Sequence, residues 1–124
     1  MSIPTKIMSD KKKMNETNDC SIIAVAITTR RSYAEVHKVF KRLGRKPRRG
    51  VHLYTIISAF SILGFTLEKS EYKGKTAKTL RVPTKDMYVA LTASHILAVQ
   101  FGLVKDWTAE RRHRINNVYR VVER

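Results

Sequence analysis

The sequence predicts an α+β protein in which helices come first and a mostly antiparallel sheet follows. Three observations lead to this prediction. Apolar residues recur at helical spacing as far as Leu63. From Phe65 onward the apolar runs are short, alternating and separated by turns, which is typical of strands. The chain has 124 residues and is 43% hydrophobic, which suits one globular core.

The N-terminal segment lacks the periodicity of the rest of the chain. Residues 1–17 contain Pro4 and three consecutive lysines, and few of their apolar residues recur at a regular spacing. We therefore expect a basic N-terminal arm over residues 1–17, flexible or loosely packed, and a single domain over residues 18–124.

The first helix of the domain is expected to begin near Asn18 or Asp19, because either side chain can cap it. Residues 22–27 are all apolar, so this helix is apolar on every side, as in a central buried helix. Its β-branched residues lower the intrinsic helix propensity, so packing must stabilise it.

Two further helices are predicted from their ends. Ser32 followed by Glu35 forms a capping-box pattern, and Gly44 follows the last apolar residue of that helix. A third helix is expected over residues 51–63, with Gly64 at its end. The segment between them, residues 45–50, predicts a basic loop.

The second half of the chain predicts strands, with Gly102 marking a tight turn between two of them. The segment 78–82 is ambiguous and ends at Pro83. The expected strands are residues 65–69, 87–91, 95–101, 103–107 and 117–122.

The chain is strongly basic, with 25 Lys and Arg against 10 Asp and Glu and a net charge of +15. Such a field attracts nucleic acid or acidic proteins. Runs of this kind are also often simply solvated surface. The candidate residues for binding nucleic acid or an acidic partner come from the two densest arginine clusters: Arg45, Lys46, Arg48, Arg49, Arg111, Arg112 and Arg114.

Cys20 is the only cysteine, which excludes an internal disulfide and fits a reducing cytoplasm. No apolar run approaches the roughly 20 residues needed to span a bilayer, and the N-terminus lacks a signal-peptide apolar core. We therefore expect a soluble cytoplasmic protein. The lone cysteine and scattered histidines give no metal-site spacing, and no Gly-rich phosphate loop is present, so no metal or cofactor is expected.

Cys20 stands where a polar cap gives way to the apolar helix. A thiol there feels unpaired backbone N–H groups and the positive end of the helix dipole, both of which favour the thiolate. A nucleophilic thiol also needs a base. Of the four histidines, His37 is expected on a solvated helix face, His52 opens the third helix and His113 lies among arginines. His95 heads an otherwise apolar strand and is the candidate base.

Asp106 is the candidate partner of His95. In a hairpin centred near Gly102, residues whose numbers sum to about 201 to 205 face each other, so Asp106 falls beside residues 95–98. Its carboxylate could hold the imidazole, or Asp106 is simply a turn residue. Trp107 could shield that contact or anchor the hairpin. For an oxyanion, the backbone N–H of Cys20 is one donor, and Asn18 or Asn15 is a candidate second donor, although Asn18 could serve only as the cap.

These residues resemble those of papain-like cysteine peptidases, which carry Cys, His and Asp in this order. Asn18-Asp19-Cys20 followed by an apolar helix resembles the nucleophile region of bacteriocin-processing peptidases. Residues 94–99 with residues 102–107 resemble their His and Asp strands. The chain as a whole is similar to small proteins of tailed bacteriophages, which share that strand pair and a basic stretch like residues 45–50.

The resemblance implies a papain-like fold and a cysteine-dependent amide hydrolase, with Cys20 as nucleophile, His95 as base and Asp106 as orienting residue. It implies a peptide or protein substrate and a site of action in the cytoplasm of an infected bacterium. Two positions depart from the family: Met14 stands where a Gln is usual, and Ser21 stands where a Gly often follows the cysteine.

Two alternatives remain open at this point. The chain could be a papain-like protein without catalysis, whose basic surface binds a host factor or nucleic acid. Cys20 could also be a buried structural residue, since free cysteines are often buried.

Overall fold

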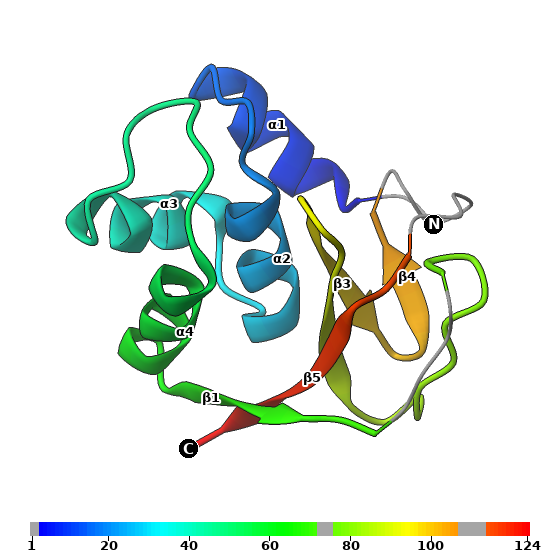
Figure 1. The fold of residues 1–124 in the computed structure, drawn as a ribbon. Coiled ribbons are helices and arrows are strands. Elements are labelled where there is room, and N and C mark those ends of the chain that lie inside the picture. Colours follow the sequence, from blue (N-terminus) through cyan, green and yellow to red (C-terminus); the bar gives the residue numbers. More distant parts are fainter. Residues whose placement is uncertain (1–2, 72–75, 107–113) are drawn as a thin grey trace.

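The structure is a computed structural model that describes residues 3–71, 76–106 and 114–124. In these ranges four helices precede all the strands of a five-stranded sheet (Figure 1). The sheet order is β1-β5-β2-β3-β4 and every pairing is antiparallel, which confirms the α+β prediction. The helices are α1 (Thr5–Lys13), α2 (Cys20–Thr29), α3 (Tyr33–Arg42) and α4 (Leu53–Ile62), and the strands are β1 (Phe65–Lys69), β2 (Met87–Leu91), β3 (Ile96–Gln100), β4 (Leu103–Lys105) and β5 (Asn117–Glu123).

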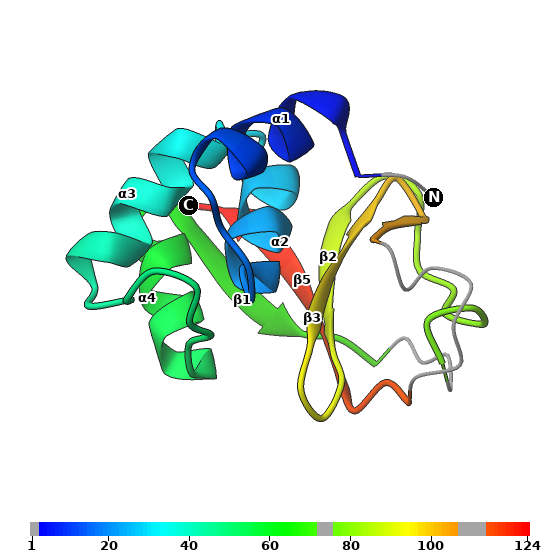
Figure 2. The same ribbon diagram turned by 90° about the horizontal axis from the view of Figure 1, so that it is seen from above.

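The helices lie on one face of the sheet, with α2 between the others and the strands (Figure 2). Helix α2 packs on β3 and also contacts α3 and α4. Every residue of α2 after Cys20 is buried, which confirms the expected central helix. This position explains how a segment rich in β-branched residues stays helical, because packing on all sides outweighs its weak intrinsic propensity.

The other face of the sheet is covered as well. Ala77 and Leu80, from the segment between β1 and β2, pack against Leu97 and Val99 of β3. The opposite side of the same strand, through Ile96 and Ala98, belongs to the core under the helices. Burial on both faces explains why β3 is almost continuously apolar rather than alternating.

The predicted cap of α3 and the glycines predicted to follow α3 and α4 are confirmed. The Ser32 side chain accepts a hydrogen bond from the backbone N–H of Glu35 at 3.1 Å, as an N-cap does. Gly44 and Gly64 follow the two helices with φ of +98° and +92°, a region where side chains other than glycine are strained. The expected third helix is shorter than predicted by two residues at its start and one at its end.

The β3–β4 hairpin has the register that the sequence predicted. Its turn residues, Phe101 and Gly102, have φ of 52° and 80°, as a two-residue hairpin turn requires. Ala98 pairs with Lys105 and Val99 with Val104, so the residue numbers of each pair sum to 203. Asp106 follows directly after β4, whereas Trp107, expected to end this strand, lies outside the described residues.

The N-terminal segment differs from the flexible or loosely packed arm expected from the sequence. Thr5–Lys13 form α1, and Ile7 is buried in the same core as α2. Ile3 also packs against that core. Ile7 is the one buried apolar residue of this short basic helix, so the periodic signal is too weak to be recognised and the helix is evident only from its tertiary contacts.

Among the described residues, none of the helices has the length and apolar character that crossing a membrane requires.

Candidate active site

Cys20 is the first residue of α2 and is only partly buried. Asp19 holds the N-cap position, yet its side chain makes no capping hydrogen bond. The first N–H groups of a helix have no partner within the helix, so the thiol lies beside free backbone donors and the positive end of the dipole. The local setting expected for Cys20 is therefore present in the structure.

His95 lies between Cys20 and Asp106. The Nε2 atom of His95 is 2.8 Å from Oδ2 of Asp106, and the Asp106 residue is only 4% exposed. The His95 side chain also forms a hydrogen bond with the Cys20 thiol. Because Asp106 engages Nε2, the second ring nitrogen, Nδ1, is the one left to serve the thiol.

His95 precedes β3 and belongs to the connection from β2. The backbone N–H of Thr92 donates to the carbonyl of His95 at 2.8 Å, which closes this connection. Because His95 lies before β3, its side chain need not point to the same face of the sheet as Leu97 and Val99, which pack away from the helices. The tertiary fold brings His95 to α2 because β3 packs directly on that helix.

The electrostatics of the site favour an ion pair between Cys20 and His95. Burial works against ionisation of the thiol, but the hydrogen bonds from the His95 side chain and the Ile96 backbone outweigh it, so the pKa of Cys20 is lowered. Burial also opposes protonation of His95, but hydrogen bonds with Asp106 and Cys20 prevail and raise its pKa to about 9. Between the two pKa values the pair is a thiolate and an imidazolium.

Cys20 and His95 face a cleft of about 990 Å³. The cleft is large enough for several amino-acid residues of a ligand. Its described lining residues come from the N-terminal segment, the start of α2, the β2–β3 connection and the segment before β5: Ile3, Met8, Lys11, Asn18, Asp19, Cys20, Ile23, Gly50, Thr92, Ala93, Ser94, His95, Asp106, Arg114 and Asn116.

Asn18, the candidate oxyanion donor, also lines the cleft. Its amide Nδ2 donates to the backbone carbonyl of Arg48 at 3.1 Å, and its φ of 51° lies in the left-handed region. A side-chain amide has two donor hydrogens, so one remains for an oxyanion. The other candidate, Asn15, is exposed and is not among the cleft residues.

The two positions that depart from the peptidase family lie away from the cleft lining. Met14 is 39% exposed at the end of α1. Ser21 is 2% exposed, and its Oγ has no hydrogen-bond partner among the described residues. The Ser21 hydroxyl is thus a buried polar atom without a partner among the described residues, which costs stability.

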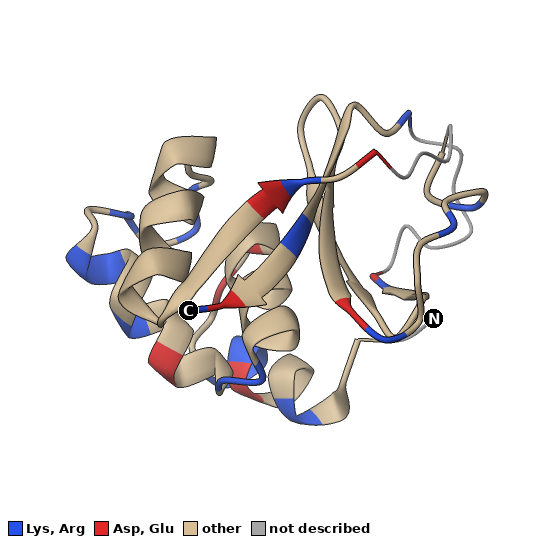
Figure 3. Ribbon diagram, turned by 90° about the horizontal axis from the view of Figure 1, so that it is seen from below, with Lys and Arg blue, Asp and Glu red and all other residues tan. Residues whose placement is uncertain are grey.

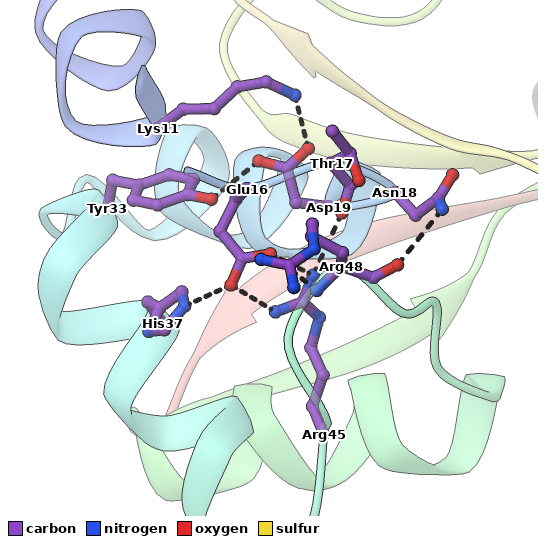
Figure 4. Close-up of polar contacts among 9 residues, drawn as sticks. All are labelled: Lys11, Glu16, Thr17, Asn18, Asp19, Tyr33, His37, Arg45 and Arg48. Carbon is purple, nitrogen blue, oxygen red and sulfur yellow. Dashed lines mark hydrogen bonds and ion pairs between the residues drawn. The ribbon is translucent and has the colours of Figure 1, made fainter. Parts of the chain in front are cut away.

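A buried polar cluster supports the segment before Cys20 (Figure 4). Glu16 is 5% exposed, and both its carboxylate oxygens are 3.0 Å from the guanidinium of Arg45. The Nε2 atom of His37 lies 2.6 Å from Oε2 of Glu16, and the backbone N–H of Arg48 donates to Oε1 of Glu16 at 2.9 Å. The hydrogen bond with Arg45 is the main cause that lowers the pKa of Glu16 to about 2, despite its burial.

Asp19, the neighbour of Cys20, has its own buried partners (Figure 4). Its carboxylate accepts hydrogen bonds of 2.6 Å from the Tyr33 hydroxyl and from Nζ of Lys11. Burial and the bond to Asp19 raise the pKa of Tyr33, so this hydroxyl stays a donor. The Asp19 side chain therefore connects the start of α2 to α1 and α3, and it does not cap the backbone of α2.

Sequence reasoning missed this cluster. His37 was expected on a solvated face, but that expectation is wrong, because its side chain is only 17% exposed and contacts Glu16. Acidic residues are scarce in this chain, and two of them, Glu16 and Asp19, stand directly before Cys20. That concentration is the signal that could have indicated a buried network, although it could not have named the partners.

The candidate basic residues divide into two groups. Arg45 is 7% exposed and paired with Glu16, so it stabilises the loop instead of presenting charge to a partner. Lys46, Arg48, Arg49 and Arg114 are exposed. Arg111 and Arg112 lie outside the described residues. Figure 3 shows that the Lys and Arg residues are distributed over helices, strands and loops.

Comparisons with protein-family models, curated proteins and solved structures find no match to this chain. Within the described ranges, no three His, Cys, Asp or Glu side chains are grouped as a metal site would need.

Proposed function

We propose that this protein is a small cysteine peptidase, or a related amide hydrolase, with a papain-like fold and a Cys20–His95–Asp106 triad. The observation that carries the proposal is the chain of contacts from Asp106 through His95 to a thiol at a helix start that opens onto a cleft. A nucleophile, a base and an orienting carboxylate in contact are what acyl transfer to a thiol requires.

In this mechanism the Cys20 thiolate attacks the carbonyl carbon of the scissile amide, and the carbonyl oxygen becomes an oxyanion. The backbone N–H of Cys20 and the remaining amide hydrogen of Asn18 are the donors available to that oxygen. The His95 imidazolium gives its proton to the amide nitrogen, which leaves as an amine. The product is a thioester between Cys20 and the acyl group.

Water then attacks the thioester while neutral His95 accepts one of its protons. The acyl group leaves as a carboxylic acid, and the thiolate–imidazolium pair is restored. Asp106 stays ionised throughout and stabilises the imidazolium. The proposal includes the setting that the resemblance implies, a bacteriophage protein acting on a polypeptide in the cytoplasm of its host.

The direct test is alkylation of Cys20 by iodoacetamide across a range of pH. A triad gives a reaction rate that rises at a pH well below the ordinary thiol value of about 8.5. Replacement of His95 by Ala should return the rise towards that value. A wild-type thiol that titrates like a free cysteine would show that the activated pair is absent.

A second candidate function is binding without catalysis. The observation that favours it is the unpartnered Ser21 hydroxyl beside the nucleophile, together with the exposed cations Lys46, Arg48 and Arg49. In that case the basic surface would bind nucleic acid, with an affinity that falls steeply as salt rises. Binding of an oligonucleotide that is insensitive to salt would exclude this candidate.

A further inference from the structure

The loop between α3 and α4 carries exposed positive charge to the edge of the cleft. Lys46, Arg48 and Arg49 are exposed, and the next residue, Gly50, lines the cleft beside Cys20. None of the three side chains forms an ion pair with another of the described residues. Their charges are therefore available to a ligand that occupies the cleft.

This loop is held in place rather than free to move. The backbone N–H of Arg49 donates to the carbonyl of Lys46 at 3.2 Å, which closes a turn around Pro47. Arg48 has φ of 60°, where glycine or asparagine is the usual choice. The backbone N–H of Arg48 donates to Glu16 and its backbone carbonyl accepts from Asn18, so both backbone polar groups of this residue are held by hydrogen bonds (Figure 4).

A fixed loop lowers the cost of ordering side chains when a ligand binds. The anchor residues Glu16 and Asn18 both belong to the segment directly before Cys20. The same contacts that place the nucleophile therefore also place the exposed cations. Left-handed backbone at a non-glycine residue is a strain that tends to persist at functional sites.

Among the described lining residues of the cleft, no exposed side chain carries a negative charge that would oppose an anionic ligand. Of the ionisable lining residues, Asp19 and Asp106 are 2% and 4% exposed and are paired with Lys11 and His95. Arg114 is the exposed charged residue among the described lining residues. The exposed positive charges near the cleft therefore attract negatively charged side chains of a ligand.

The remaining wall of the cleft distinguishes a polypeptide from a nucleic acid. Ile3, Met8 and Ile23 make one part of the lining aliphatic, and Met8 is 42% exposed. No Phe, Tyr or Trp occurs among the described lining residues. Single-stranded nucleic acids are usually bound by stacking on aromatic rings, whereas aliphatic side chains of a peptide suit an Ile and Met surface.

We propose that the cleft takes an acidic polypeptide, in which an aliphatic residue lies against Ile3, Met8 and Ile23 and neighbouring carboxylates lie against the loop of Lys46, Arg48 and Arg49 and against Arg114. This inference rests on the proposed function, because it names the substrate class of the same site. It makes the loop a specificity determinant, distinct from the triad that performs the reaction.

The test uses the full chain with Cys20→Ala, so that a bound peptide is not consumed. The probe is a short fluorescein-labelled peptide in which glutamates flank a leucine, and its partner has glutamine at each glutamate position. Binding is measured by fluorescence anisotropy in the Cys20→Ala protein, in a Lys46→Glu and Arg49→Glu variant, and in a control with Lys38→Glu and Lys69→Glu. The loop variant and the control variant carry the same net charge. Neither control position is next in sequence to a residue of the cleft lining, whereas Arg49 directly precedes Gly50.

The acidic peptide should bind about tenfold more weakly to the loop variant, corresponding to two lost charge contacts, while the control changes by less than about threefold. The glutamine peptide should not distinguish the two variants. Equal weakening in both variants would assign the attraction to the overall charge and overturn the inference. A failure of the acidic peptide to bind, with an oligonucleotide bound through the same loop, would overturn it in favour of a nucleic acid.

The outcomes for the inference and for the proposed function are separable. If the Cys20→Ala protein binds the acidic peptide through the loop but the wild type does not cleave it, the proposed hydrolysis is wrong and the binding site stands. If the wild type cleaves glutamine and glutamate peptides at the same kcat/KM, the hydrolase stands and the acidic specificity is wrong.

Discussion

Two carboxylate–histidine pairs in the described parts of the chain have opposite surroundings. His95 and Asp106 are 2.8 Å apart, and His37 and Glu16 are 2.6 Å apart. The far side of the His95 ring meets a thiol and an open cleft. The His37 ring lies 6.0 Å from the ring of Tyr33, and its carboxylate partner is also held by Arg45 and Arg48.

The difference shows that a carboxylate–histidine pair can be either structural or reactive, depending on what surrounds it. Glu16 is held by four hydrogen bonds, and its pKa of about 2 marks a carboxylate that stays ionised and anchors three segments. Asp106 instead acts on a histidine whose pKa of about 9 is coupled to a thiol. The Glu16–His37 pair therefore stabilises the fold, whereas the Asp106–His95 pair lies beside the Cys20 thiol, with which it can exchange a proton.

Exchange of the two histidines for alanine should separate the pairs most clearly. His95→Ala should lower hydrolysis by about a thousandfold, because the Cys20 thiol loses its proton acceptor, the thiolate loses its counterion and the leaving amine loses its proton donor. It should also raise the pKa of Cys20, since burial then dominates. Iodoacetamide titration and a peptide assay measure both effects. His37→Ala is the matched control and should leave the Cys20 titration in place. A Cys20 pKa that moves equally in both variants would contradict the division.

Glu16→Gln should cause the largest loss of stability. It leaves the buried Arg45 guanidinium without its counterion, and we expect the free energy of unfolding to fall by about 3 kcal/mol. Urea denaturation monitored by circular dichroism measures this change. Asp106→Asn should affect stability less, because His95 can lose its proton when the charge of Asp106 is removed.

The pH dependence of stability gives an independent check on Glu16. Its pKa is lowered from 4.5 to about 2, so its contribution is fully present above pH 4.5 and is lost as the pH falls towards 2. The difference between wild type and Glu16→Gln should therefore shrink over that interval. A difference that is constant from about pH 6 to about pH 2 would mean that Glu16 titrates as an ordinary carboxyl group.

Asp106→Asn should have an intermediate effect on the reaction. An amide can still orient the ring but does not stabilise the imidazolium by charge, so we expect kcat to fall about thirtyfold. The alkaline limb of the pH–rate profile should move below the value of about 9 set by His95, because a group with a lowered pKa loses its proton sooner. An unchanged alkaline limb would show that Asp106 does not control the protonation of His95.

Tyr33→Phe should have the smallest effect. It removes the hydroxyl that donates to Asp19 but keeps the buried ring, and Lys11 still pairs with that carboxylate. The expected loss of stability is about 1 kcal/mol, with a small change in the Cys20 titration. Thermal denaturation measures the first and alkylation the second. A large shift in the reactivity of Cys20 would mean that the hydrogen bond between Tyr33 and Asp19 helps to position the nucleophile.

Local patterns in the sequence were enough to predict the class of fold and the order of the elements from α2 onward. Local signals were sufficient for this: the apolar run after Cys20, the cap at Ser32, and the turn at Gly102, which fixed the hairpin register. That register also placed Asp106 near His95, since pairing across a short hairpin follows from chain positions alone.

Contacts between residues far apart in the sequence could not be predicted in this way and are known from the folded structure. The contact of Cys20 with His95 depends on α2 packing against β3. The helix over Thr5–Lys13 depends on the packing of Ile7 in the core, and the burial of Arg45 and His37 depends on Glu16; no local pattern in the sequence records these contacts. Charged residues look alike in a sequence whether they are solvated or paired, because the free energy that distinguishes the two comes from burial and from partners supplied by other segments.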